Sequence, residues 1–199
     1  MNATLSRRTL LAATVLGAAV LPACEHKATV IYKGIDLTGA TYATDFRLND
    51  PDGKERTLTD FRGKAVLIFF GFTQCPDVCP TALTRAAEVK RLLGTDGDRF
   101  QTLFITVDPE HDTPDVLKAY TAAFDPTFIG LHGDLQRIDE VAKDFKVYYK
   151  KVPTGSSYTM DHTSLSYVYD PQGKLRLALR HEQPAQDYAA DIRKLLNPA

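Results

Sequence analysis

The sequence predicts a single domain of the α/β class, and three observations support this prediction. Residues 65–70 (AVLIFF) are all apolar, with the length and composition of a strand that is buried on both faces of a sheet. A second such strand follows at 100–107 (FQTLFITV), and segments with helical periodicity alternate with the strands. About 175 residues follow Cys24, which is enough for one domain with its own core.

The first half of the domain should contain a hairpin and then a strand–helix unit. Short strands at 46–48 and 55–58 flank the turn sequence DPDG at 50–53, which predicts a hairpin. After the buried strand, a helix is expected from Pro80 to a stop at Gly94. Proline suits the first turn of a helix, and glycine suits its end.

The second half continues the alternation of strands and helices. The sequence TPD at 113–115 supplies an N-cap, a first-turn proline and an acidic residue, so a helix is expected to about Phe124. Two later helices are expected at 135–145 and at about 184–196. Further strands are expected at 147–152, 165–169 and 175–179. This order, βαβα followed by a β-hairpin and a helix, predicts a thioredoxin-like fold with an N-terminal extension.

The N-terminus, residues 1–23, has the pattern of an export signal. Two arginines, Arg7 and Arg8, precede an apolar stretch at 10–21, and the segment has no acidic residue. This stretch is shorter than the roughly 20 residues that span a bilayer core, but it suits a signal peptide. The arginine pair also resembles a twin-arginine signal, so export by either the general or the twin-arginine route stays open.

The sequence LPAC at 21–24 resembles the lipobox of bacterial lipoproteins, which predicts lipid attachment at Cys24. The alternative is an uncleaved membrane anchor with an incidental cysteine. Residues 24–42 are then expected to form a membrane tether, and residues 43–199 the domain. We therefore expect a lipid-anchored protein on the periplasmic side of the bacterial inner membrane.

Charge argues against one class of partner. Without the two leader arginines, the 24 basic residues fall to 22 against 25 acidic ones, a formal charge of −3. The chain has no basic patch, charge run or low-complexity segment, so we expect no binding to nucleic acid.

The cysteines Cys75 and Cys79 lie in GFTQCPDVCP, directly after the buried strand. In α/β folds the carboxyl end of such a strand is where ligands bind. A disulfide across three intervening residues would close a small loop and stabilise the fold little, so chemistry explains the pair better. Cys79 precedes Pro80, so we expect it at the helix cap, where the helix dipole stabilises a thiolate. The pair can form a reversible disulfide or bind a soft metal ion.

A metal site would need a third ligand, and two thiolates with an imidazole favour copper. Of the five histidines, His162 is distinctive because it lies in TMDHT, a polar segment directly before a predicted strand. A lone loop histidine is more often a hydrogen-bonding residue than a ligand, so the residues alone leave its role open. The other four lie in polar or loop segments: His26, His111, His132 and His181.

Three motifs in order resemble the Sco/SenC family of copper-binding assembly proteins: GFTQCPDVCP, VDPEHDTP at 107–114, and DHTS at 161–164 with YDPQG at 169–173. The similarity covers approximately residues 40–198. It implies a thioredoxin-like fold and a copper site, for Cu(I) or Cu(II), made by Cys75, Cys79 and His162. It also implies a partner, the cytochrome c oxidase subunit II or another periplasmic copper protein.

Two functions remain open at this point. In the first, the protein is a copper metallochaperone without catalytic turnover. In the second, it is a thiol–disulfide oxidoreductase in which Cys75 and Cys79 form a redox-active pair that keeps the cysteines of the copper acceptor reduced. His162 distinguishes the two, because copper retention should need it and simple dithiol exchange should not. The sequence therefore leaves enzymatic activity undecided and favours a binding protein.

Overall fold

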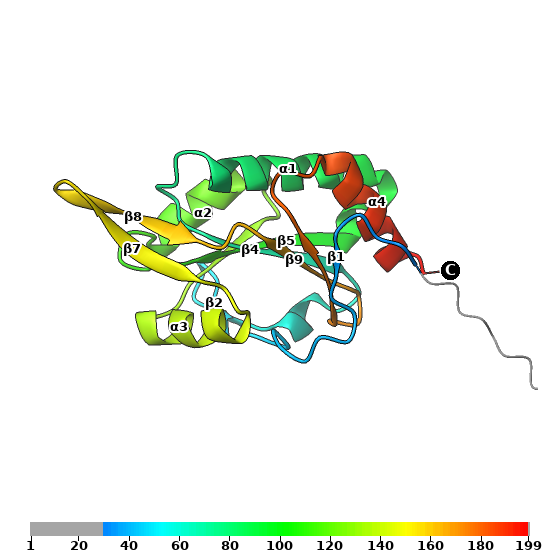
Figure 1. The fold of residues 1–199 in the computed structure, drawn as a ribbon, viewed down its shortest axis with the longest axis horizontal. Coiled ribbons are helices and arrows are strands. Elements are labelled where there is room, and N and C mark those ends of the chain that lie inside the picture. The colour runs from blue at the N-terminus through cyan, green and yellow to red at the C-terminus, as the bar shows by residue number, and fades with distance from the viewer. Residues whose placement is uncertain (1–29, 199) are drawn as a thin grey trace, which may run out of the picture.

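Strand β4 (Ala65–Gly71) lies inside a six-stranded sheet, and all seven of its residues are buried, as its apolar sequence predicts. The computed structural model describes residues 30–198, drawn in colour in Figure 1. Strand β5 (Phe100–Thr106) runs parallel to β4 on one side, and β9 (Ser166–Tyr169) runs antiparallel on the other. The strand order β1-β10-β9-β4-β5-β6 confirms the predicted thioredoxin-like arrangement.

The outer strands of the sheet are shorter. Strand β10 (Leu175–Leu179) pairs with β9, and β6 (Ile129–Leu131) runs parallel to β5 at the other edge. Strand β1 (Ile35–Asp36) pairs antiparallel with β10 and forms the last strand on that side. Residues 35–36, which we placed in the tether, are thus part of the sheet, because their backbone groups complete the edge of β10.

Helices cover both faces of the sheet (Figure 1). On one face, α1 (Val78–Leu93) packs beside α4 (Ala185–Leu196), and α2 (Pro114–Ala122) lies on the same side. Helix α3 (Leu135–Asp144) lies on the opposite face. Side chains of β4 point alternately to the two layers, as they must in a strand.

The expected N-terminal hairpin is present. Strands β2 (Leu48–Asn49) and β3 (Glu55–Arg56) pair antiparallel around a turn in which Gly53 has a φ of 80°, a conformation that favours glycine. A short 3-10 helix (Leu58–Phe61) follows and leads into β4.

A second hairpin projects from the body of the domain (Figure 1). It is formed by β7 (Tyr149–Thr154) and β8 (Ser157–His162), paired antiparallel. The sequence predicts β7 approximately, but it does not predict β8 and indicates a polar loop there. Its sequence SYTMDH has few apolar residues, because most of the strand does not face the core.

Helix α1 begins at Val78, two residues earlier than expected, with Asp77 as its N-cap residue. Cys79 therefore lies inside the first turn rather than at the cap. Pro80 still fits, because the N–H groups of the first turn have no partner within a helix. Strand β6 was missed because three residues carry too little periodicity to predict a strand.

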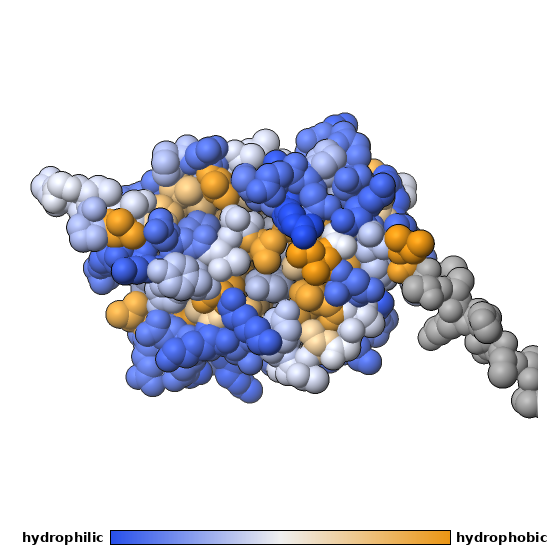
Figure 2. All heavy atoms as spheres, in the orientation of Figure 1, coloured by the Kyte–Doolittle hydropathy of each residue, from blue (hydrophilic) through white to orange (hydrophobic). Residues whose placement is uncertain are grey.

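On the face drawn in Figure 2, hydrophilic residues cover most of the surface and hydrophobic ones form small separate groups. Within residues 30–198, none of the helices combines the length and hydropathy that a membrane span requires. The predicted signal peptide and the lipid site at Cys24 lie outside the described residues.

Candidate metal centre

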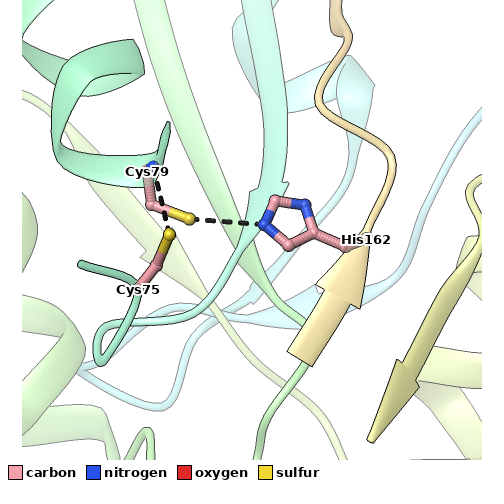
Figure 3. Close-up of side chains that lie close together, drawn as sticks. All are labelled: Cys75, Cys79 and His162. Atoms are coloured by element: carbon pink, nitrogen blue, oxygen red, sulfur yellow. Dashed lines mark hydrogen bonds between the residues drawn. The ribbon is translucent and has the colours of Figure 1, made fainter. Parts of the chain in front are cut away.

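The three residues singled out by the sequence converge at one place (Figure 3). Cys75 lies in the loop after β4, Cys79 in the first turn of α1, and His162 is the last residue of β8. Their ligand atoms all lie within 4.8 Å of one another. No other group of three or more potential ligands occurs in residues 30–198.

The backbone brings the two cysteines together at the carboxyl end of β4. The Cys75 N–H donates to the carbonyl of Phe72 at 3.3 Å, so the chain turns back before α1 begins. Gly71 provides the space for the second sulfur. A Cβ at this position would lie 2.8 Å from the Cys79 Sγ, closer than side chains pack.

The two sulfurs differ in their surroundings. The backbone N–H of Cys79 donates to the Cys75 Sγ at 3.4 Å. The Cys79 thiol contributes most, and this N–H adds to it; both stabilise the Cys75 thiolate and lower the pKa of Cys75 to about 3, against the opposing effect of burial. The Cys75 thiolate and burial both raise the pKa of Cys79. The metal-free pair is therefore one thiolate and one thiol.

This corrects our expectation for Cys79. We predicted that the start of the helix would lower the pKa of Cys79, but the N–H group there points to Cys75 instead. Cys79 itself is completely buried, whereas Cys75 is partly exposed. The more reactive sulfur is the one that solvent can reach.

His162 directs its Nε2 atom toward the Cys79 sulfur. Its Nδ1 lies 3.0 Å from the carbonyl oxygen of Thr163, which can only accept a hydrogen bond, so Nδ1 carries the proton. The Nε2 atom is then free as a ligand in the neutral ring, and it lies 3.5 Å from the Cys79 Sγ. The rings of Phe69 and Phe72 stand edge-on to the imidazole, with centroids 5.8 and 5.9 Å away, and fix its orientation.

The donor set fits copper. Two sulfur donors suit Cu(I), and the added imidazole also suits Cu(II). The site borders a cleft of about 260 Å³ whose lining includes Cys75 and His162, so an ion has access from solvent. A hydrogen bond on the non-ligating nitrogen, as in His162, is the usual arrangement at a metal-binding histidine.

The remaining histidines of the described region serve other contacts or lie elsewhere. His111 lies 2.9 Å from the carboxylate of Asp108, and the backbone of His132 pairs with Asn49. His181 lies beside Glu182, just before α4. None of these three histidines belongs to a group of potential metal ligands in the described residues. His26 lies outside the described residues.

The aspartate that anchors the cysteine loop was not identified from the sequence. Asp112 is 2% exposed and accepts hydrogen bonds from the backbone N–H and the hydroxyl of Thr73, two residues before Cys75. No local pattern indicates which distant residue a loop carboxylate will contact.

Comparisons with known proteins show the family of the chain. The family model described as SCO1/SenC matches residues 36–197. The chain is 42% identical over 133 residues to the SCO2-like protein of Rickettsia felis, covering 65% of each chain, so it spans just under two thirds of that relative's length.

Solved structures agree in fold. The structure of Bradyrhizobium japonicum ScoI with copper bound is 45% identical, with a TM-score of 0.70 over 76% of this chain and 97% of that one. A SCO1/SenC family lipoprotein from Bacillus anthracis is 26% identical, with a TM-score of 0.67 over 77% and 94% of the two chains.

Proposed function

Because the chain belongs to the SCO1/SenC family, we propose that it is a copper metallochaperone that binds the ion through Cys75, Cys79 and His162. The observation that carries this proposal is the convergence of two sulfurs and one imidazole nitrogen within 4.8 Å, from segments 83 residues apart. A thiol pair that served exchange alone would not need a histidine oriented by its own hydrogen bond. The copper-bound relative supports the choice of metal.

The acceptor in this proposal is the binuclear copper centre of cytochrome c oxidase subunit II or another periplasmic copper protein. Delivery by ligand exchange is supported by the partial exposure of Cys75, which lets an incoming ligand reach the ion. The buried Cys79 would release the ion last. Copper is thus a cargo of the protein rather than a resident cofactor.

The same proposal includes a lipid anchor at Cys24 on the periplasmic side of the bacterial inner membrane. The lipobox-like LPAC and the apolar leader support it. The lipoprotein from Bacillus anthracis supports it from within the family. Globomycin treatment of producing cells, or mass spectrometry of the membrane fraction, tests the modification, and a Cys24→Ser variant should be released from membranes.

Copper titration tests the metal site. The protein carrying Cys24→Ser, which leaves only the site cysteines, is titrated with Cu(I) and Cu(II) against competing chelators. We expect Cys75→Ala or Cys79→Ala to abolish tight binding of both ions. His162→Ala should weaken Cu(II) by about 10–100-fold or more, the scale seen on losing even a hydrogen-bonding partner of a ligand, and Cu(I) by less.

His181→Ala is the matched control for this titration, because His181 lies in the segment between β10 and α4. It should bind both ions as the parent does. Equal Cu(II) affinity of His162→Ala and the parent would contradict the ligand assignment.

One observation favours the second function, a thiol–disulfide oxidoreductase. Cys75 and Cys79 are both free, and the partly exposed one has a pKa of about 3, as nucleophilic thiols in exchange enzymes do. Insulin reduction by the metal-free protein tests this function. Rapid turnover that is unchanged in His162→Ala, together with weak copper binding, would replace the chaperone proposal with the oxidoreductase.

A further inference from the structure

The loop between β5 and α2 contacts both halves of the metal centre. The half with the cysteines and the half with His162 come from distant parts of the chain, and each makes hydrogen bonds to the segment Asp108–Asp112, the first through Thr73 and the second through Tyr158. We propose that these residues, here called the brace, set the distance between the two sulfurs and the imidazole, with Asp112 and Asp108 as positioning residues. This inference rests on the proposed copper site and names residues that control it.

The first arm of the brace holds the cysteine loop. The carboxylate of Asp112 accepts from the Thr73 hydroxyl at 2.6 Å, the Thr73 backbone N–H at 3.1 Å and the Thr106 hydroxyl at 2.5 Å. Bonds of this kind to a buried carboxylate are strong and directional. Because Thr73 lies two residues before Cys75, these bonds fix where the loop leaves β4.

The second arm holds the hairpin. The Tyr158 hydroxyl donates to the carboxylate of Asp108 at 2.8 Å and lies 2.7 Å from the Nδ1 of His111, which is itself 2.9 Å from the same carboxylate. Lys151 on β7 adds an ion pair with Glu110 at 2.8 Å. Tyr158 lies four residues before His162 in β8, so the two residues belong to the same face of the strand.

The brace is a single turn, so its two arms cannot move independently. The N–H groups of His111 and Asp112 both donate to the carbonyl of Asp108, at 3.2 and 3.0 Å. The N–H of Asp108 donates to the Thr106 hydroxyl at 2.9 Å, and this hydroxyl also bonds Asp112. Asp108 and Asp112 are 3% and 2% exposed, so water competes little for these bonds.

The hairpin needs such a support. Strands β7 and β8 form a separate two-stranded sheet, and an isolated hairpin is at best marginally stable in water. At the start of β7, the Tyr149 hydroxyl also donates to Asp139 of α3. The hairpin is therefore held at two places, on α3 and on the brace, and only the brace also bonds the cysteine loop.

Substitution of Tyr158 tests the second arm, because Tyr158→Phe removes only the hydroxyl. In the Cys24→Ser chain we expect Cu(II) affinity to fall by about 10–100-fold and the thiolate-to-Cu(II) absorption to shift, since His162 is less well placed. Cu(I) affinity should change less. Because Tyr158 acts through the histidine, Tyr158→Phe should have no further effect on Cu(II) in a His162→Ala background.

Tyr188→Phe is the matched control, because its hydroxyl donates to the carbonyl of Arg180, at the start of the segment that joins β10 to α4. It should leave affinity and spectrum unchanged. Parental Cu(II) affinity and spectrum in Tyr158→Phe, or an undiminished effect in the His162→Ala background, would overturn the second arm.

Substitution of Asp112 tests the first arm. Asp112→Asn replaces one acceptor oxygen with a donor, so it cannot satisfy all three bonds, and we expect weaker binding of both ions that persists in the His162→Ala background. Asp170→Asn is the matched control. Its carboxylate is 4% exposed and bonds Arg176 and the turn before β10. If both variants lose copper equally, or neither does, the first arm is refuted.

A metal-free measurement separates the brace from the proposed function. By amide hydrogen exchange, Tyr158→Phe should raise exchange in β7 and β8 at least about tenfold, and Asp112→Asn should do so in residues 73–79. Failure of the parent to bind copper would refute the proposed function while these exchange results still decide the brace. Exchange that matches the parent in both variants would refute the brace even if copper binds.

Discussion

The Nε2 atom of His162 lies 3.5 Å from the sulfur of Cys79, although 83 residues separate the two in the chain. Cys79 is fixed by the packing of α1 on the sheet, whereas His162 is the last residue of β8, at the base of a projecting hairpin. One ligand therefore belongs to the core of the domain and the other to its most extended element. The geometry of the centre depends on how the hairpin is held.

The reactivity of Cys75 tests the electrostatics of the pair. With a pKa of about 3, Cys75 should react with iodoacetamide at a rate that hardly changes between about pH 5 and pH 8 in the metal-free Cys24→Ser protein. In Cys79→Ala the pKa of Cys75 should rise, because the thiol that donates to it is lost, and the rate should then fall toward low pH. Mass spectrometry of the alkylated peptide gives both profiles.

An ordinary thiol profile for Cys75 in the parent, with a midpoint near about pH 8.5, would contradict this assignment. Buried Cys79 provides the internal comparison, because it should remain unmodified in the folded protein under the same conditions.

Gly71 is predicted to be required for the position of the Cys79 sulfur. In Gly71→Ala the new Cβ would lie 2.8 Å from this sulfur and 2.9 Å from the ring of Phe104, so the sulfur must shift. We expect a loss of about 1–3 kcal/mol in the free energy of unfolding, as for other overpacked cores, together with weaker copper binding. Urea denaturation and chelator competition measure the two effects.

Gly130→Ala provides the control for Gly71→Ala. Its Cβ would lie 2.9 Å from the Cβ of Leu117, a comparable clash between β6 and α2. It should lose similar stability and keep the parental copper affinity. If both variants lose copper affinity in proportion to their loss of unfolding free energy, the prediction of a specific role for Gly71 is wrong.

The elements that the sequence predicted well are those whose own residues determine them. Residues 65–70 form a strand because six consecutive apolar residues are best buried in the middle of a sheet. Thr113 caps α2 because its hydroxyl accepts the N–H of Val116. By contrast, β8 is stabilised by pairing with β7 and by Tyr158, and neither contact is visible in its own composition.

The residues of the candidate site also differ in how well the local sequence predicts them. The two cysteines stand out because they are close in sequence and follow the central strand. His162 could be assigned only by resemblance, since no local signal links it to residues 83 positions away. The choice of Cys79 as the thiolate failed for a related reason. Helix α1 starts two residues early, and its free N–H points to Cys75 rather than to the Cys79 sulfur.

Asp125 should make stability depend on pH in the acid range. Burial alone would raise the pKa of Asp125, but hydrogen bonds from Thr127 and Lys90 outweigh it and hold the pKa below its usual value. The ionised carboxylate therefore stabilises the fold above the unfolded-state pKa of about 3.9, and this contribution is lost as the pH falls through the lower folded-state pKa.

In Asp125→Asn we expect a loss of about 1–2 kcal/mol near pH 7 that shrinks below about pH 4, measured by urea unfolding across pH. Asp52→Asn is the comparison, because its ion pair with Lys118 is exposed and should contribute little at any pH. A stability difference between Asp125→Asn and the parent that stays constant down to about pH 3 would contradict the assigned ion pair.

Asp191 is predicted to attach the N-terminal segment to the domain. Its carboxylate, on α4, is fully buried and accepts the N–H groups of Lys33 and Gly34, each at 2.8 Å, directly before β1. Asp191→Ala should lose about 2–3 kcal/mol of stability, because two backbone N–H groups lose a buried, charged acceptor. It should also expose the residues around β1 to limited proteolysis.

Asp187→Ala, on the same helix, is the control, because it removes only a favourable charge near the helix N-terminus and should lose about 0.3–1 kcal/mol. Cleavage near β1 that is equally slow in both variants would show that the pairing of β1 with β10 holds the segment without Asp191.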